Sequence, residues 1–199
     1  MKRKLGTFLM ILGCGLVAAA LALFLHNRQE QLRAEEASRE AITKVVEVIL
    51  QEQEETGPAV PVAPQDRVMT VSEIDGHGYI GFLGIPALEL ELPVMADWTY
   101  PQLQIAPCRY MGSTFTDDLV IVAHNYPRHF GGLRDLKTGE SVTFTDMDGE
   151  TTSYQVTALE ILPADAVEDV TSGDFALTLF TCTYGGENRV VLRCDRVLQ

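Results

Sequence analysis

The stretch ALTLFTCTYGGENRVVLRCDRV, residues 176–197, is the most informative about the fold. Two apolar runs, Leu177–Thr181 and Arg189–Val197, flank a connection that contains a Gly-Gly pair. Short apolar runs separated by a glycine-containing turn are typical of two paired strands. The stretch therefore predicts a β-hairpin, with Cys182 at the end of its first strand and Arg189 at the start of its second.

Further short strands are predicted on the N-terminal side of this hairpin. One of them shows strict alternation of leucine and glutamate, the pattern of a half-buried strand, and Asp148-Gly149 is a hairpin turn signal. The predicted strands are Tyr79–Ile85, Leu88–Val94, Leu119–Ala123, Glu140–Thr145 and Thr151–Leu162. About seven short strands with few helical segments predict a mainly β domain over residues 67–199, built as a closed or nearly closed β-barrel.

The chain begins with a membrane-anchor pattern. Leu5–Leu25 contains 21 residues without a charge, long enough as a helix to cross a hydrocarbon core of about 30 Å. Lys2, Arg3 and Lys4 precede it, which predicts a cytoplasmic N-terminus and an extracellular remainder. A cleaved signal peptide is the alternative, but its apolar region is usually shorter. We therefore expect residues 1–26 to form a cytoplasmic tip and a retained single-pass anchor in the cell membrane.

Residues 27–66 are expected to hold the barrel away from the membrane. Asn27–Glu55 is rich in helix-forming residues and in i,i+4 pairs of opposite charge, which predicts a solvated helical stalk. Three prolines in Thr56–Asp66 predict a stiff, extended linker. The chain after residue 26 carries 12 basic and 28 acidic residues, and a surface this acidic argues against nucleic-acid binding.

Two apolar strands end in residues that could carry chemistry. Leu119–Ala123 runs into His124, and Leu177–Thr181 runs into Cys182. A side chain at a strand end is held by a rigid element yet is open to solvent. A cysteine needs a base or a cation nearby to act as a thiolate, and histidine is the natural partner. We therefore predict Cys182 as a nucleophile and His124 as its proton partner.

Arg189 is the candidate oxyanion stabiliser. If the hairpin pairs as expected, Arg189 lies opposite Cys182, where a guanidinium can donate hydrogen bonds to a tetrahedral intermediate. Arg193 has the same strand parity, but it lies about 13 Å further along the strand. His129 is the rival histidine, and it follows a loop segment rather than a strand.

The cysteines and histidines give no sign of a metal site. Cys14 lies inside the apolar run, which leaves Cys108, Cys182 and Cys194 in the exported domain. A disulfide between two of the three would still leave one thiol free, and the sequence leaves open whether Cys108 and Cys194 pair. No CxxC pair or zinc-ligand spacing is present, so we expect neither a metal nor another cofactor.

At these residues the sequence resembles the sortases of Gram-positive bacteria. Thr178-Leu179-Phe180-Thr181-Cys182 fits the family's TLxTC motif, and Ala123-His124-Asn125-Tyr126 with His129–Leu133 is similar to the segment around its histidine. Arg189 matches the arginine that begins the next strand. The 14 residues between Leu162 and Leu177 argue against class B, whereas the His-Asn pair is compatible with it. The class stays open between B-like and D-like.

The resemblance implies an eight-stranded β-barrel that carries out a two-step transfer. Cys182 would attack a carbonyl in a C-terminal sorting motif of a surface protein and form a thioacyl intermediate. His124 would protonate the leaving amine, and Arg189 would steady the oxyanion. An amine of a peptidoglycan precursor or a pilin would then resolve the intermediate. The same motifs make Thr181 and Asn125 candidate substrate-binding residues.

Two other functions fit the same residues. A secreted cysteine peptidase would need the same nucleophile and base but would transfer the acyl group to water. A non-catalytic anchored β-barrel would hold Cys182 as a buried apolar side chain. The reactivity of the Cys182 thiol and the fate of an acyl group separate these alternatives from a transpeptidase.

Overall fold

One long helix and a set of short strands make up the protein. The computed structural model describes residues 2–55, 67–172 and 174–197. Its helices are α1 (Lys2–Glu55), α2 (Tyr100–Leu103) and α3 (Val167–Thr171), with short 3-10 turns at Pro86–Leu88 and Leu133–Asp135. Its strands are β1 (Ser72–Ile74), β2 (His77–Ile85), β3 (Leu90–Met95), β4 (Cys108–Met111), β5 (Leu119–Val122), β6 (Ser141–Asp146), β7 (Thr151–Pro163), β8 (Leu177–Cys182) and β9 (Asn188–Arg196).

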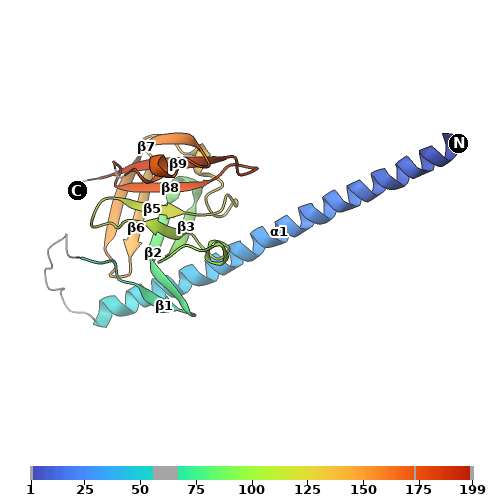
Figure 1. Ribbon diagram of the computed structural model, residues 1–199. Helices are drawn as coiled ribbons and strands as arrows, with labels where there is room; N and C mark the ends of the chain where they lie inside the picture. The colour runs from blue at the N-terminus through green and yellow to red at the C-terminus, as the bar shows by residue number, and fades with distance from the viewer. Residues whose placement is uncertain (1, 56–66, 173, 198–199) are drawn as a thin grey trace.

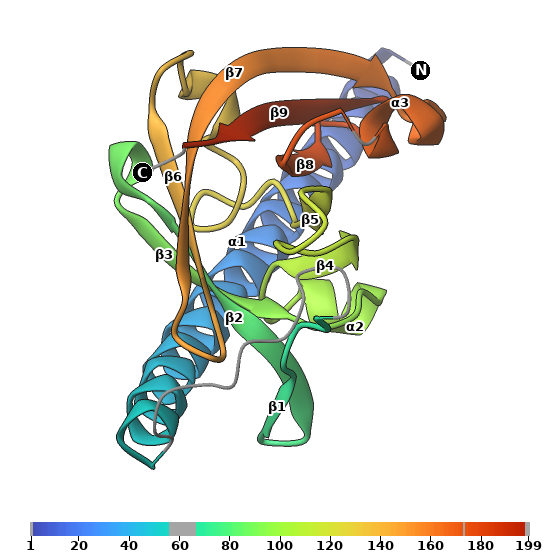
Figure 2. The same ribbon diagram turned by 90° about the vertical axis from the view of Figure 1, so that its left-hand side faces the viewer.

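The strands β2 to β9 form a closed barrel (Figures 1 and 2). Their order is β2-β3-β4-β5-β8-β9-β7-β6, and antiparallel pairing of β6 with β2 closes the ring. Most neighbours are antiparallel, but β3–β4 and β5–β8 are parallel. The short strand β1 extends β2 outside the ring. The closed barrel that the strand pattern predicted, with the eight strands that the resemblance implied, is confirmed.

Local sequence signals located most strands but not all of them. The β6–β7 hairpin turns at the predicted Asp148-Gly149 pair, where Gly149 adopts a φ of 78° that favours glycine. The strands β1 and β4 were not predicted. They are three and four residues long, too short for an alternating pattern to be read.

The barrel interior is a single apolar core. Alternate side chains of the strands point inward, and the largest buried members include Leu83, Phe130, Phe144 and Tyr154. A second cluster of buried residues, which includes Tyr79, Met95 and Met147, lies between the outside of the barrel and α1. The barrel therefore has one face that is buried by a helix from outside the ring.

The C-terminal part of α1 packs on the barrel rather than standing in solvent. Ala34, Ser38, Ala41, Val45 and Ile49 recur at helical spacing and are all buried. The C-terminal part of α1 lies along β1, β2 and β3 (Figure 2). The helix was predicted correctly, but the prediction that it forms a solvated stalk was wrong, because this apolar stripe is covered by the barrel. The predicted linker, Thr56–Asp66, lies outside the described residues.

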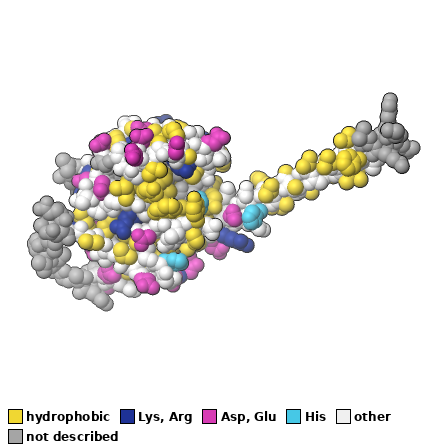
Figure 3. Space-filling view, in the orientation of Figure 1, with side chains coloured by type: hydrophobic (Ala, Val, Ile, Leu, Met, Phe, Trp, Pro, Cys, Tyr) yellow, Lys and Arg dark blue, Asp and Glu magenta, His cyan; other side chains and the backbone are white. Residues whose placement is uncertain are grey.

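The N-terminal part of α1 projects away from the barrel (Figure 1). Large apolar side chains such as Leu16 and Val17 are at least 65% exposed. Hydrophobic side chains cover most of the face of this part that Figure 3 shows. By length and composition, this is the one helix among the described residues that could cross a membrane. It is therefore a candidate membrane anchor.

Candidate active site at the ends of strands β5, β8 and β9

Cys182 is the last residue of β8, and the backbone register places it directly opposite Arg189 of β9. The hairpin connection between the two strands is closed by a hydrogen bond from Thr183 N to Asn188 O of 2.9 Å. Cys182 is half-buried, so its thiol is neither sealed in the core nor fully in solvent. The predicted pairing of Cys182 with Arg189 across a hairpin is confirmed, whereas their chemical roles stay predictions.

The two arginines of β9 are in different environments. The Arg189 guanidinium is half-buried and donates from Nη1 to the carbonyls of Gly186 and Asn188, at 3.0 and 3.2 Å. Arg193 is 2% exposed, pairs with Glu160 at 2.9 Å and donates to Thr178 and to carbonyls of α3. Arg193 therefore joins barrel elements to one another, and Arg189 alone of the two lies beside Cys182.

His124 leaves the barrel at the same edge as Cys182. The strands β5 and β8 are parallel, with Val122 paired to Phe180, so His124 and Cys182 each stand two residues beyond paired positions. Burial lowers the pKa of His124, and the carboxylate of Glu30 on α1 opposes this effect. A lowered pKa favours the neutral imidazole at physiological pH, the form that can accept a proton.

Thr181 and Asn125 are the two predicted substrate-binding residues. The Thr181 side chain is 3% exposed, and its hydroxyl donates to the carbonyl of Ala123 at 2.8 Å. This bond joins the end of the cysteine strand to the end of the histidine strand. Asn125 is half-buried and is not part of the groove that contains Cys182. The Thr181 hydroxyl thus faces Ala123 rather than open space, and the substrate contacts of Thr181 and Asn125 stay predictions.

His129, the rival histidine, is buried beneath the loop and α1. Its exposure is 0%, and neither ring nitrogen has a hydrogen-bond partner among the described residues. Burial lowers the pKa of His129 to about 4, helped by the neighbouring charge of His124. The backbone of Ala34 on α1 lies near the ring without a well-aligned hydrogen bond and opposes this effect. The Tyr126 ring stands between the two histidines, with ring centroids 4.9 Å from His124 and 5.6 Å from His129. A neutral, enclosed ring of this kind is a poor proton shuttle.

An aromatic groove of about 190 Å³ leads to Cys182 and Arg189. The Tyr110 ring lies between Trp98, stacked at 5.6 Å, and Phe180, which meets it edge-on at 5.4 Å. Helix α3 forms another wall through Val167 and Thr171. Sequence analysis did not identify this groove. The available signal in the sequence was the single tryptophan, Trp98. The structure leaves it 41% exposed, and a large aromatic side chain left in solvent often marks a binding surface.

The other cysteines of the barrel are unsuited to nucleophilic chemistry. Cys108 and Cys194 are fully buried and unpaired, and burial raises the pKa of each thiol to about 12. Cys182 is the one cysteine of the barrel that is partly open to solvent. Within the described ranges, no group of three or more His, Cys, Asp or Glu side chains could hold a metal ion.

Comparison with known proteins agrees with this fold. A family model described as the Sortase domain matches residues 83–197. The solved structure of a sortase C from Streptococcus pneumoniae is 24% identical, with a TM-score of 0.61, and the match covers 80% of this chain and 97% of that one. Sortase C1 from Streptococcus agalactiae is 24% identical, with a TM-score of 0.56 and coverages of 79% and 90%.

A sortase C from Clostridium perfringens has 18% identity, a TM-score of 0.53 and coverages of 80% and 91%. At these identities the solved structures show the fold alone and leave the class a prediction. No curated protein matches the chain in sequence. The sortase family model, however, spans more than half of the 199 residues, so the chain belongs to the sortase family.

Proposed function

We propose that this sortase-family protein is an anchored cysteine transpeptidase, with Cys182 as nucleophile, His124 as acid and base, and Arg189 as oxyanion stabiliser. The observation that carries the proposal is the register of β8 and β9, which sets a half-exposed thiol opposite a guanidinium at the end of an aromatic groove. A core cysteine would have neither the exposure nor the cation.

The first step forms a thioester. His124, in its neutral form, accepts the proton of the Cys182 thiol. The thiolate attacks the carbonyl carbon of a peptide bond in a C-terminal sorting motif, and the carbonyl oxygen becomes negatively charged. Arg189 donates hydrogen bonds to this oxyanion. As the C–N bond breaks, His124 gives its proton to the departing amine. The N-terminal part of the substrate is left as a thioester on Cys182.

The second step reverses these roles with a new amine. A cell-wall precursor or a pilin amine attacks the thioester carbonyl and loses a proton to His124. The tetrahedral intermediate then expels the Cys182 thiolate and leaves a new amide bond. The groove lined by Trp98, Tyr110 and Phe180 is suited to the apolar side chains of a sorting motif, because it offers aromatic surface next to the thiol.

The same proposal places the protein in the membrane. The uncharged run of α1 spans the bilayer, with Lys2, Arg3 and Lys4 in the cytoplasm and the barrel outside the cell. This orientation puts the active site on the side where exported substrates and cell-wall amines are found.

Capture of the thioester tests the mechanism. The full chain in detergent is incubated with a pool of candidate sorting peptides, quenched in acid and examined by intact-mass and peptide mass spectrometry. A peptide acyl group on Cys182, released as an amide when an amine is added, is the expected result. An acyl group that goes only to water at saturating amine would establish a peptidase instead. No adduct on Cys182 with any peptide, while the thiol still reacts with iodoacetamide, would count against the proposed substrate class.

A further inference from the structure

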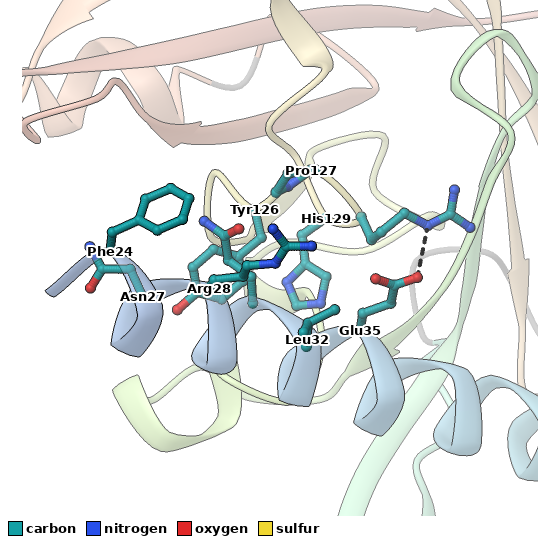
Figure 4. Close-up of a pocket in the computed structure, with 10 residues that line it drawn as sticks. Phe24, Asn27, Arg28, Leu32, Glu35, Tyr126, Pro127 and His129 are labelled. Atoms are coloured by element: carbon teal, nitrogen blue, oxygen red, sulfur yellow. Dashed lines mark ion pairs between the residues drawn. The ribbon is translucent and has the colours of Figure 1, made fainter. Parts of the chain in front are cut away.

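A second cavity lies between α1 and the loop that carries His124. It has a volume of about 450 Å³, larger than the groove at Cys182. One face of α1 lines it, through Phe24, Asn27, Arg28, Gln31, Leu32 and Glu35. The opposite wall is the loop segment Tyr126–His129, which faces these side chains in Figure 4. The reaction proposed above leaves this cavity without a role.

The cavity lies at the level of the lipid headgroups if α1 spans the membrane. The uncharged run ends at Leu25, and its 21 residues match the thickness of a hydrocarbon core, about 30 Å. Phe24 is thus at the edge of the hydrocarbon, and Arg28 lies about 6 Å beyond it along the helix. The polar layer of each leaflet is about 5–8 Å deep. The mouth of the cavity therefore opens into this polar layer.

The walls of the cavity combine apolar surface with positive charge. Phe24 and Leu32 are large apolar side chains more than half exposed to solvent. Arg28 has no ion-pair partner among the described residues. Arg128 reaches Glu35 only at 3.7 Å, whereas Glu35 binds Arg39 more closely, at 2.8 Å. Two arginines with spare hydrogen-bonding capacity are unusual in a chain that is strongly acidic after residue 26.

This combination fits an amphiphile with a phosphate group. Arginine binds phosphate oxygens in a planar, two-point geometry, and an arginine at the membrane surface attracts anionic lipids. We propose that the cavity between α1 and the loop 126–129 binds the phosphate headgroup of an anionic membrane lipid. The acyl chains would remain in the bilayer along Phe24, and the phosphate would lie between Arg28 and Arg128. The proposal rests on the anchor orientation given under Proposed function.

The cavity also lies close to His124. The Tyr126 ring forms part of its wall and lies 4.9 Å from the His124 ring. A lipid bound there would hold the loop against α1 and would place a lipid-borne group beside the proposed base. The site is thus positioned to link occupancy by a lipid to the geometry of His124.

Native mass spectrometry of the full chain in a neutral detergent tests the site. The probe is dilauroyl phosphatidylglycerol, titrated against wild type, the double variant Arg28→Gln/Arg128→Gln, and the control Arg33→Gln. Arg33 is an exposed residue of the same helix outside the cavity, and its substitution removes one positive charge, half of the change in the double variant. We expect wild type to retain one lipid. The affinity for this lipid should be about tenfold weaker in the double variant, because two partly exposed charge contacts are lost, and unchanged in the control.

Four results would overturn the proposal. Equal lipid affinity of the double variant and wild type would mean that lipid binds the apolar span without this site. A loss of affinity in the control as large as in the double variant would mean the same. Dilauroylglycerol, which lacks phosphate, binding as well as the phospholipid would remove the role of the arginines. Glycerol 1-phosphate binding as tightly as the lipid would identify a free phosphate ester, not the membrane, as the ligand source.

The anchor itself is checked separately by alkaline extraction of membranes that contain the full chain. Protein that stays in the membrane pellet but fails the lipid test disproves the site and leaves the anchor intact. Protein that is extracted disproves the membrane anchor on which the site depends. Thermal unfolding of each variant shows whether the substitutions leave the fold unchanged.

Discussion

The two halves of the candidate active site are held by different kinds of structure. Cys182 and Arg189 lie on adjacent antiparallel strands, where the backbone register fixes them opposite each other. His124 begins a loop whose outer side is covered by α1, a helix outside the barrel. The strand half depends on backbone hydrogen bonds, whereas the loop half depends on side-chain packing against α1. Substitutions should therefore affect the two halves in different ways.

The strand half gives the largest expected effect. Cys182→Ala should lower transfer by roughly four orders of magnitude or more, because the covalent step is lost. Its unfolding free energy should change by less than about 1 kcal/mol, since the side chain is only half-buried. Peptide transfer and thermal unfolding measure the two quantities.

Cys108→Ala is the matched control for this change. Cys108 is fully buried in the cluster beneath α1, so its truncation should cost stability and leave transfer by the folded protein unchanged. A folded Cys182→Ala protein that retained transfer would remove Cys182 from the mechanism.

The arginines of β9 give the second comparison. Arg189→Ala should lower kcat/KM by about 10²–10³, the usual cost of losing one oxyanion donor, with little change in stability. Arg193→Ala should leave kcat/KM of the folded protein nearly unchanged and lower stability. It would leave buried carbonyls of α3 and the Thr178 hydroxyl without their donor, and should lower the unfolding free energy by about 2–4 kcal/mol. Kinetics and denaturant unfolding of both variants measure these two quantities. Loss of activity without loss of stability in Arg193→Ala would contradict the assignment of Arg189 as the oxyanion donor.

Loosening α1 should act on the loop half alone. Val45 is fully buried between α1 and the barrel, so Val45→Asp places a charge in an apolar contact and should release the helix. We expect transfer to fall about tenfold, because His124 loses its support. Hydrogen exchange should rise in residues 124–131, while iodoacetamide still reacts with Cys182.

Leu50→Asp adds the same charge on the outer face of α1, where Leu50 is 57% exposed, and should behave as wild type. If Val45→Asp left exchange in the loop unchanged, the loop would not depend on the helix.

His129 gives the smallest effect on transfer and a clear effect of pH on stability. Its pKa is about 4 when folded and about 6.5 when unfolded, so the unfolded chain binds more protons below pH 6.5. The stability associated with the neutral ring is therefore present above pH 6.5 and is lost as the pH falls toward 4. The loss is at most about 3 kcal/mol. His129→Phe should reduce this loss in thermal melts and leave transfer at pH 7 within a few-fold of wild type.

Asp146 must be substituted before this measurement, because its titration changes stability with pH in the direction opposite to that of His129. Burial raises the pKa of Asp146 from 3.8 to about 6, so stability from its protonated form is lost as the pH rises through this range. The histidine comparison is therefore made in an Asp146→Asn background. The exposed Asp148→Asn serves as a control for the change in surface charge. A pH dependence unaffected by His129→Phe would show that the ring is not buried in a neutral form.

Patterns local in the sequence determined most of the strands, the helix and the candidate nucleophile. Alternating leucines, the Asp148-Gly149 turn and the helical spacing of α1 can be read from neighbours a few residues apart. The hairpin that pairs Cys182 with Arg189 is of the same kind, because a short connection fixes its register. The uncharged run of 21 residues likewise identifies a candidate anchor without any tertiary information.

Only the tertiary structure decided which similar residues differ in environment. Arg189 and Arg193 have the same strand parity, and His124 and His129 lie in one loop, yet one member of each pair is buried. Burial depends on contacts with α3 and α1, which are distant in sequence. The closure of β2 on β6 and the packing of α1 on the barrel are decided in the same way. Such contacts form between surfaces that the order of residues does not bring together, so no local pattern encodes them.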